Sequence, residues 1–598
     1  MAPEVTAWQF VLAVAAFLLV FDNAPLWRGI LDAASPATLA DGVFLASIGV
    51  VLLVAFNLLG TAIALPYILK PVTIVVLLTS AVAVHFMSAY GVMLDRTMMR
   101  NVFETDPAEV FELLNAGLVG HVLVLGVLPA IVVARTRIRY RSFRHEARNR
   151  IALLVASLLT IGATALVFNK DFAILGREHR EIRYLINPTN YIYSTMRFVS
   201  RSLQAPAAER IPIGEDARLS AARAGSPRRR VVVLVVGETA RAQNFSLDGY
   251  ERDTNPRLAR EDIISFQDAR SCGTSTAESL PCMFSHLTRH EYDRGKARHY
   301  ENLLDVVSRA GVHVLWRDNN SGCKGLCDRV DHEDVVTPFV PELCRSDECY
   351  DEKLIDRLDD RLGAMDRDAL IVLHQRGSHG PSYHLRVPPA FEVFRPICAT
   401  NDVRSCSTES LLNAYDNTIL YTDHVLAELI GFLRARTDRF DSVVLYASDH
   451  GESLGEKGLY LHGLPYWMAP DEQTHIPMIL WLSDAERGAL ELDRGCLEAK
   501  ADTPVSHDNL FDSILGVLGI ETSVYTPERD LFASCRTAAG SPASGEIPAK
   551  AGAQRPGSTP VSATERSQRR RATAASRLAA LGFARTGGPD IPNAPPGP

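Results

Sequence analysis

The sequence predicts an N-terminal transmembrane domain of five helices, followed by a soluble domain of the α/β class. The first 170 of the 598 residues hold several long apolar runs, whereas the remainder has the mixed composition of a globular protein. Beyond residue 229, β-branched runs alternate with helical patterns, which indicates layers of helices on a sheet. All ten cysteines lie between Cys272 and Cys535, in the soluble part. We therefore expect a transmembrane domain at 1–170, a linker at 171–228, a catalytic domain at 229–536 and a tail at 537–598.

Five apolar stretches have about the length of 20 residues that a membrane-crossing helix needs. They run over residues 7–24, 43–66, 71–93, 117–134 and 151–168. The first of them carries Asp22 near its end. It does not read as a cleaved signal peptide, because no Lys or Arg precedes it and no A-x-A-like cleavage site follows it.

The loop between the fourth and fifth stretches carries seven arginines, from Arg135 to Arg150. The positive-inside rule places this loop in the cytoplasm. Counting outward from it puts the N-terminus in the cytoplasm and everything after about residue 170 on the opposite, periplasmic side. The cysteines indicate the same side, because an even number confined to a soluble region suggests disulfides, which persist in oxidising compartments.

Several other classes of function find no support. The net charge of -8 is spread along the chain, which gives no basis for nucleic-acid binding. The sequence has no G-x-x-x-x-G-K-[ST] loop for a nucleotide phosphate. The alternative use of Cys323 and Cys327 as zinc ligands lacks a second Cys/His pair at a finger-like spacing.

Three segments lie outside the two main domains. Residues 94–116, on the periplasmic side, are amphipathic and carry an Asp-Pro-Ala-Glu helix start. They fit either a helix lying at the membrane interface or a device that positions a lipid beside the soluble domain. The linker contains an expected interfacial helix around 172–188. The tail at 537–598 is rich in Ala, Pro, Gly, Ser and Arg, so we expect it to be disordered.

The soluble part contains five runs that fit buried strands. Such continuous apolar, β-branched runs are typical of strands covered on both faces in a parallel sheet. The runs are VVVLVV after Arg230, VHVLW from Val312, ALIVLH from Ala369, SVVLYA from Ser442 and PMILWL from Pro477.

A polar cluster follows each of the first four strands. In open α/β sheets, sites form beyond the carboxyl ends of the strands, so we expect the four clusters to converge. Each one alone fits an ordinary turn or cap, but together they supply the carboxylates and imidazoles that bind Zn²⁺. The clusters contain Glu238 and Thr239, then Asp318 and Asn320, then His374 and His379, then Asp449, His450 and Glu452.

Hydroxyl groups precede a helical pattern in the segment SCGTSTAESLPCMFS from Ser271. A hydroxyl at a helix N-terminus can meet a phosphate held by backbone N–H groups and the helix dipole. A nearby metal can activate such a hydroxyl as a nucleophile. The alternative interpretation is an ordinary Ser/Thr N-cap.

Five segments resemble the signature segments of the lipid A phosphoethanolamine transferases, a family that includes the mobile colistin-resistance enzymes. The resemblance covers about residues 1–535 and implies a soluble domain of the alkaline phosphatase/sulfatase type. The segments are GETARAQNFSLDGYERDTNPRL, CGTSTAESLPCMFS, RDNNSGCKGLC, HQRGSHGPSYH and YASDHGESLGEKGLYLHGLPY.

The resemblance implies a role for each matching residue. Thr276 matches the nucleophile, and the zinc ligands are matched by Glu238, Thr276, Asp449 and His450. His379 and His462 match histidines near the transferring phosphate, where they can also hold a second zinc. Asn320 and Lys324 match contacts to the substrate phosphate, and Glu452, in the same DHGE turn, is a further candidate that either supports a site residue or contacts the substrate. One departure is Glu278, which stands where many relatives have a smaller or apolar residue.

Three disulfides are implied by the resemblance: Cys272 with Cys282, Cys323 with Cys327, and Cys398 with Cys406. We pair the other four cysteines by their proximity in the sequence and by elimination. The expected pairs are Cys344 with Cys349 and Cys496 with Cys535.

The reaction implied is transfer of phosphoethanolamine from phosphatidylethanolamine to a phosphate of lipid A, through a covalent intermediate on Thr276. Zinc is the implied cofactor, polymyxin resistance the implied outcome, and a monomer the expected state. Alternatives are a related transferase with a lipopolysaccharide core sugar or a glucan as acceptor, a phosphatase or sulfatase, and a non-catalytic membrane sensor. The sulfatase motif C/S-x-P-x-R is absent.

Overall fold

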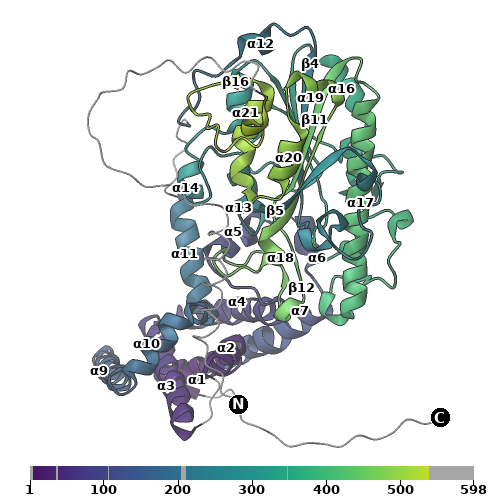
Figure 1. The fold of residues 1–598 in the computed structure, drawn as a ribbon. Helices are drawn as coiled ribbons and strands as arrows, with labels where there is room; N and C mark the ends of the chain where they lie inside the picture. Colours follow the sequence, from purple (N-terminus) through teal and green to yellow (C-terminus); the bar gives the residue numbers. More distant parts are fainter. Residues whose placement is uncertain (1–3, 35–37, 106, 204–209, 346–347, 538–598) are drawn as a thin grey trace, which may run out of the picture. The chain divides into compact units, whose positions relative to one another are not determined.

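The computed structural model describes residues 4–537, except 35–37, 106, 204–209 and 346–347. The predicted disordered tail therefore lies outside the described residues, apart from Thr537. The fold below concerns the described part of the chain alone (Figure 1).

Four helices of the N-terminal part are long and apolar enough to cross a membrane, and a fifth span results if one bent pair is counted as one. The bent pair is α1 (Ala7–Val20) and α2 (Ala24–Ala34), which meet at 56°. The others are α3 (Leu39–Ala62), α4 (Leu69–Tyr90), the continuous stretch Ala116–Arg135 made by α7 (Ala116–His121), η1 (Val122–Val127) and α8 (Leu128–Arg135), and α9 (Phe143–Val167).

The break between α1 and α2 falls at Asp22 and Asn23, both fully buried. The Asn23 side-chain amide donates to the carbonyl oxygens of Leu18 and Asn187, each at 2.8 Å. A buried polar group must find such partners, and here they come from the end of α1 and from the linker. The predicted stretch 7–24 is therefore a helix that ends at Val20 and turns.

The soluble part is built on an eight-stranded sheet of order β15-β5-β14-β11-β4-β10-β6-β7. The central strands β4 (Arg229–Gly237), β6 (His313–Asp318), β10 (Ala369–His374) and β11 (Phe440–Ser448) run parallel. They are flanked by β5 (Ile263–Arg270), β7 (Asp331–Asp334), β14 (His475–Leu482) and β15 (Val505–Ser506).

One predicted strand, β14, runs antiparallel to its neighbour β11. A parallel return needs a crossover long enough to span the sheet, usually a helix. Between β11 and β14 the chain forms only two short strands, a one-turn 3₁₀ segment and the four-residue helix α18 (Asp471–Thr474). Strand β5 was not predicted, because its partly exposed segment alternates instead of forming a continuous apolar run.

Alternate residues of β4 face two separate cores. Val231, Val233 and Val235 pack with the side that holds α16 (Leu358–Ala364) and the long helix α17 (Thr408–Arg434). Val232, Leu234 and Val236 pack with α15 (Leu303–Arg309), α20 (Arg494–Ala501) and α21 (Leu510–Leu518). Figure 1 shows α17 and the pair α20 and α21 on opposite sides of the sheet. Burial on both faces explains the unbroken apolar runs.

The register of the parallel strands brings their carboxyl ends to one edge. Ser448 of β11 lies beside Gly237 of β4, and His374 of β10 lies beside both Val236 and Asp318. The residues that follow these strand ends are therefore neighbours in space, although they lie up to about 200 positions apart in the sequence.

Residues 94–116 form two short helices, α5 (Arg96–Glu104) and α6 (Pro107–Glu112). Both contact the soluble domain: Arg294 pairs with Glu104 at 3.1 Å, and Arg386 pairs with Glu112. The linker forms α10 (Asn169–Glu178), η2 (Arg180–Leu185) and α11 (Thr189–Leu203). We expected one interfacial helix around 172–188. The extent of that prediction is wrong, because the segment is divided at His179 into α10 and η2.

The ten cysteines form five disulfides and none is free. The pairs are Cys272–Cys282, Cys323–Cys327, Cys344–Cys349, Cys398–Cys406 and Cys496–Cys535, which match the expected pairs.

The Cys496–Cys535 bond should contribute the most stability, because its partners are 39 positions apart, whereas Cys323 and Cys327 are 4 apart. Loop-closure entropy gives about 4 kcal/mol for the long loop and about 2 kcal/mol for the short one. Replacing Cys496 and Cys535 with Ala should therefore lower the thermal unfolding midpoint more than replacing the other pair does. Equal or reversed effects would contradict the entropic account.

Candidate active site and metal centre

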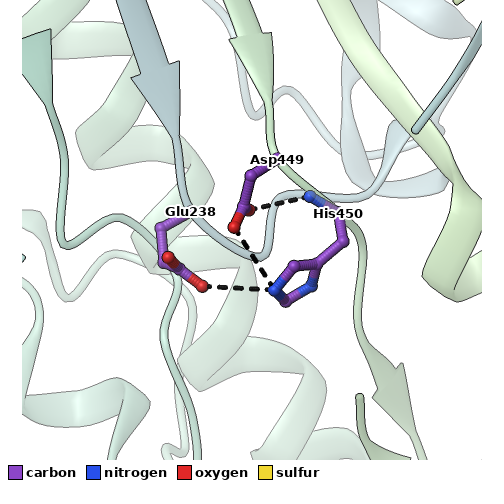
Figure 2. A group of neighbouring side chains, drawn as sticks. All are labelled: Glu238, Asp449 and His450. Atoms are coloured by element: carbon purple, nitrogen blue, oxygen red, sulfur yellow. Dashed lines mark hydrogen bonds and ion pairs between the residues drawn. The ribbon is translucent and has the colours of Figure 1, made fainter. Parts of the chain in front are cut away.

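Two carboxylates and one imidazole meet where β4 and β11 end. Glu238 directly follows β4, and Asp449 and His450 directly follow β11; all three are fully buried. Their candidate ligand atoms all lie within 4.8 Å of one another. His450 Nε2 is 3.5 Å from Glu238 Oε1 and 3.4 Å from Asp449 Oδ2 (Figure 2). We call these three residues the triad.

Hydrogen bonds around the triad fix which atoms face its centre. His450 Nδ1 lies 2.9 Å from the Gly451 carbonyl oxygen, which can only accept, so Nδ1 carries the proton and Nε2 offers its lone pair. Asp449 Oδ1 accepts from the backbone N–H groups of Thr239 and His450 at 3.2 and 2.7 Å. The other oxygen, Asp449 Oδ2, is buried and accepts no hydrogen bond among the described residues.

The electrostatics of the triad favour a bound cation. Burial, together with the neighbouring Asp449 carboxylate, raises the pKa of Glu238 well above its usual range. Burial raises the pKa of Asp449 to about 6, and burial lowers the pKa of His450. Two adjacent buried carboxylates repel each other when both are ionised, and a divalent cation removes that cost. An orphan carboxylate oxygen, a second carboxylate and an imidazole lone pair fit zinc.

Thr276 is the first residue of α13 (Thr276–Met283) and faces the triad. Its hydroxyl lies 3.0 and 3.1 Å from the two Glu238 carboxylate oxygens and 3.4 Å from His450 Nε2. Ser275, not Thr276, is the N-cap residue, and its side chain makes no capping hydrogen bond. The position of Ser275 therefore fits the Ser/Thr N-cap interpretation of this segment, but that interpretation does not apply to Thr276.

Three other hydroxyls close to these residues in the sequence, those of Thr239, Thr274 and Ser275, are alternative nucleophiles, but they do not face the triad in this way. Thr274 Oγ1 donates to the Leu464 carbonyl oxygen at 2.6 Å. The hydroxyls of Thr239 and Ser275 are buried and have no hydrogen-bond partner among the described residues. Of these four hydroxyls, only that of Thr276 is hydrogen-bonded to Glu238 among the described residues.

Two residues expected to contact phosphate lie beside Thr276 in different ways. Asn320 donates from Nδ2 to Glu238 Oε2 at 2.7 Å and to the Gln375 carbonyl oxygen at 2.9 Å, so it orients the triad carboxylate. The Lys324 ammonium donates to Ser321 Oγ at 2.8 Å. Lys324 also lines a cavity of about 40 Å³ together with Thr276, His379 and His462.

His379 and His462 occupy the other side of this cavity, with ring centroids 5.8 Å apart. Burial lowers the pKa of His379 well below its usual value. Burial also acts to lower the pKa of His462, but the Glu452 carboxylate, 2.7 Å from its Nδ1, outweighs burial and raises it. His462 is therefore the imidazole better suited to hold and donate a proton.

Glu452 is fully buried, and both of its oxygens have partners within the protein. Oε2 pairs with His462, and Oε1 accepts from the Tyr383 hydroxyl at 2.6 Å. The geometry therefore gives Glu452 the task of holding His462, and not that of a direct substrate contact.

The membrane part brings to the cavity further residues that were not predicted from the sequence. Asn101, Glu104, Thr105 and Glu109, from the segment 94–116, line it beside Thr276. Glu109 Oε1 lies 3.6 Å from His379 Nε2. The Asp-Pro-Ala-Glu start of α6 marked this segment, but nothing in its pattern indicates which strand ends it meets.

A buried triad at the carboxyl edge of a mostly parallel sheet, with a hydroxyl at a helix start beside it, defines the alkaline phosphatase/sulfatase type of domain. In agreement, the family model described as Sulfatase matches residues 230–520. The family model described as phosphoethanolamine transferase EptA/EptB matches residues 52–203, which lie mostly in the membrane part.

Similar proteins match nearly the whole described chain. Phosphoethanolamine transferase EptA of Escherichia coli (strain K12) is 38% identical over 536 residues, covering 89% of this chain and 98% of that protein. Phosphatidylethanolamine transferase Mcr-1 of Escherichia coli is 38% identical, covering 86% of this chain and 96% of that protein. The integral membrane lipooligosaccharide phosphoethanolamine transferase A of Neisseria meningitidis matches in structure with a TM-score of 0.86, at 38% identity, covering 89% and 99% of the two chains. The chain belongs to the phosphoethanolamine transferase family.

The raised pKa values predict how zinc and pH act together on stability. Asp449 has a higher pKa when folded, about 6, than its ordinary value of 3.8. In metal-free protein, protonated Asp449 therefore contributes to the stability of the fold below about pH 4. This contribution is lost as the pH rises through about 6 and the carboxyl group ionises. A metal needs the carboxylates deprotonated, so added zinc should raise the unfolding midpoint little at about pH 5 and strongly at about pH 7.5.

A matched control distinguishes the effect of zinc binding on stability from the effect of protonation alone. Asp423 is also fully buried, and burial raises its pKa to about 6 as well, but its carboxylate accepts from backbone N–H groups. Asp449→Asn should abolish the zinc-dependent gain in the midpoint, whereas Asp423→Asn should keep it. A zinc gain that persists in Asp449→Asn, or that is equal at both pH values, would show that the metal binds elsewhere.

Proposed function

We propose that this protein transfers phosphoethanolamine from phosphatidylethanolamine to a phosphate of lipid A, through a covalent intermediate on Thr276. The observation that carries the proposal is the Thr276 hydroxyl, 3.0 Å from Glu238 and 3.4 Å from His450 at the start of α13. The family to which the chain belongs supports the same reaction, because the relatives are named as phosphoethanolamine and phosphatidylethanolamine transferases.

Glu238, Asp449 and His450 would hold zinc, with the Thr276 oxygen as the fourth ligand. When bound there, zinc supplies Lewis-acid stabilisation of the phosphoryl oxygens and lowers the pKa of the Thr276 hydroxyl. The chain's own groups do the rest. Lys324 positions phosphoryl oxygens, Asn320 holds the Glu238 carboxylate, and the rigid start of α13 aims the Thr276 oxygen at phosphorus.

Two displacements complete the transfer. In the first, the Thr276 oxygen forms a bond to phosphorus, its proton passes to the Glu238 carboxylate that the hydroxyl contacts, and the bond from phosphorus to the glycerol oxygen breaks. His462, which Glu452 keeps basic, donates the proton that the departing diacylglycerol oxygen needs. In the second, a phosphate oxygen of the acceptor forms the new bond to phosphorus, and the Thr276 oxygen leaves and regains its proton.

The proposal requires donor and acceptor to reach the site from a membrane. We propose five spans, with the bent pair α1 and α2 counted as one, in a bacterial inner membrane and with the catalytic domain in the periplasm. Masking a phosphate with a cationic ethanolamine lowers the negative surface charge, and it thereby favours resistance to cationic polymyxins. A monomer is sufficient for this chemistry, because each group named above comes from one chain.

A different type of acceptor is also a candidate, because a further relative of the chain supports it. The Kdo(2)-lipid A phosphoethanolamine 7''-transferase of Escherichia coli is 32% identical over 301 residues, which cover 51% of that protein. A sugar hydroxyl of the lipopolysaccharide core, or of a glucan, would then replace the lipid A phosphate in the second displacement. Mass spectrometry of the modified lipid distinguishes the two acceptors.

Thr276 should carry the donor group when the acceptor is withheld. Protein incubated with phosphatidylethanolamine alone should gain one phosphoethanolamine, mapped to Thr276 by peptide mass spectrometry, because this hydroxyl alone of the four candidates contacts Glu238. Thr276→Ala should abolish the adduct, and Thr276→Ser, which keeps a hydroxyl, should retain part of it.

Three outcomes separate the alternatives. Adduct on Thr239, Thr274 or Ser275 would move the nucleophile but keep the reaction class. Lipid A modified at full rate with no adduct would contradict the covalent mechanism. A Thr276→Ala variant that retains its biological function would favour a non-catalytic sensor over an enzyme.

A further inference from the structure

A second, larger cavity lies beside the reaction centre. Its volume is about 640 Å³, and it is bounded by α5, by the segment around α14 (Arg294–Ala297) and by the loop that contains Lys324. Seven lysine and arginine residues line it, against three acidic residues. Such an excess of positive charge in a recess favours an anionic ligand. We call it the basic cavity.

Arg100 is one group in the basic cavity that lacks a hydrogen-bond partner among the described residues. It is partly buried on α5, and its guanidinium makes no hydrogen bond or ion pair within the part of the chain that the structure describes. Burial, and after it the nearby positive charge of Arg294, lowers its pKa. A guanidinium usually finds a carboxylate or phosphate when water is removed from it, because burying an unpaired charge is costly.

Two further donors in the same cavity are unsatisfied. Arg294 pairs with Glu104 through Nη2, but its Nη1 is buried and has no hydrogen-bond partner among the described residues. The Tyr292 hydroxyl is also buried and unpartnered there. Arg100, Arg294 and Tyr292 all line the basic cavity, so three donors that lack partners border one space. That combination fits the oxygens of one phosphate group.

The basic cavity is next to the place where phosphoryl transfer is proposed. Lys324 and Glu104 line both the basic cavity and the small cavity that holds Thr276. One headgroup could therefore reach both spaces. Phosphatidylethanolamine carries a single phosphate, which is the one that reacts, so a second anionic group must belong to the acceptor.

We propose that the basic cavity binds a second phosphate of the acceptor glycolipid while the first phosphate reacts at Thr276. The inference rests on the proposed function. Arg100 and Arg294 are the residues that hold the second phosphate, with the Tyr292 hydroxyl as a further donor. The cavity thus selects a bisphosphorylated acceptor, and its Arg100 and Arg294 take no part in binding the donor lipid.

The test measures the two half-reactions separately in the full-length protein. The first is formation of the adduct on Thr276 from phosphatidylethanolamine, and the second is its transfer to bisphosphorylated or monophosphorylated lipid A in detergent micelles. Loss of a charge-assisted contact typically costs about a tenfold change in binding. Arg100→Gln should therefore raise KM for the bisphosphorylated acceptor about tenfold or more and leave KM for the monophosphorylated acceptor unchanged.

Control variants separate charge from structure. Arg100→Lys should recover part of the affinity, because it keeps the positive charge without the planar guanidinium. Arg434→Gln removes an arginine that pairs with Glu261 at the surface, and it should affect neither acceptor. Arg100→Gln should change the unfolding midpoint little, because Arg100 has no hydrogen bond or ion pair to lose among the described residues and only the weaker attraction of Glu104 and Glu278 is removed.

Four outcomes would overturn the proposal. They are equal effects of Arg100→Gln on both acceptors, no effect on either, a slower formation of the Thr276 adduct, and a lower unfolding midpoint. If wild-type protein forms no adduct and modifies neither acceptor, the proposed function itself fails, and that result is distinct from each of these four.

Discussion

The placement of two carboxylates side by side in a fully buried site is the constraint on which the rest of the structure depends. Glu238 and Asp449 are held there by the register of β4 and β11, which brings Gly237 beside Ser448. Backbone N–H groups occupy one Asp449 oxygen and leave the other without a partner among the described residues. Such an arrangement is unfavourable without a cation, and it becomes a strong ligand set with one.

The groups that act on a substrate are organised around that constraint by different parts of the chain. The start of α13 brings the Thr276 hydroxyl to Glu238, and Asn320 holds the same carboxylate from the end of β6. Glu452 keeps His462 basic. The membrane part contributes Glu104 and Glu109 through α5 and α6, so the reaction space is complete only when both parts of the chain are present. This requirement suits substrates that stay in a bilayer.

Much of the site follows from the sequence, because strand ends in a parallel sheet must converge. The runs before Glu238, Asp318 and Asp449 are continuous and apolar, so both their strands and their shared edge could be predicted. The antiparallel direction of β14 could not be predicted, because it depends on the path by which residues 449–474 lead back to the sheet. The pairing of Glu452 with His462 could not be predicted either, because these residues lie ten positions apart, on either side of two short paired strands that have no clear sequence pattern.

The membrane part shows the same limit on what can be predicted from the sequence. Its apolar stretches could be read from hydropathy, but the turn at Asp22 and Asn23 depends on a hydrogen bond to Asn187, 164 positions away. Likewise, an amphipathic pattern marks α5 as a helix at a boundary without indicating that Arg100 and Arg294 meet in one cavity. Long-range contacts between unlike segments leave no periodic signal in either one.

Metal analysis of purified protein tests the central claim most directly. The account predicts about one zinc per chain in the wild type and in Thr276→Ala, since three protein ligands and a water still complete a tetrahedral site. It predicts loss of both zinc and transfer in Asp449→Asn, while Thr276→Ala loses transfer alone. An Asp449→Asn variant with full zinc content and full transfer activity would contradict the account.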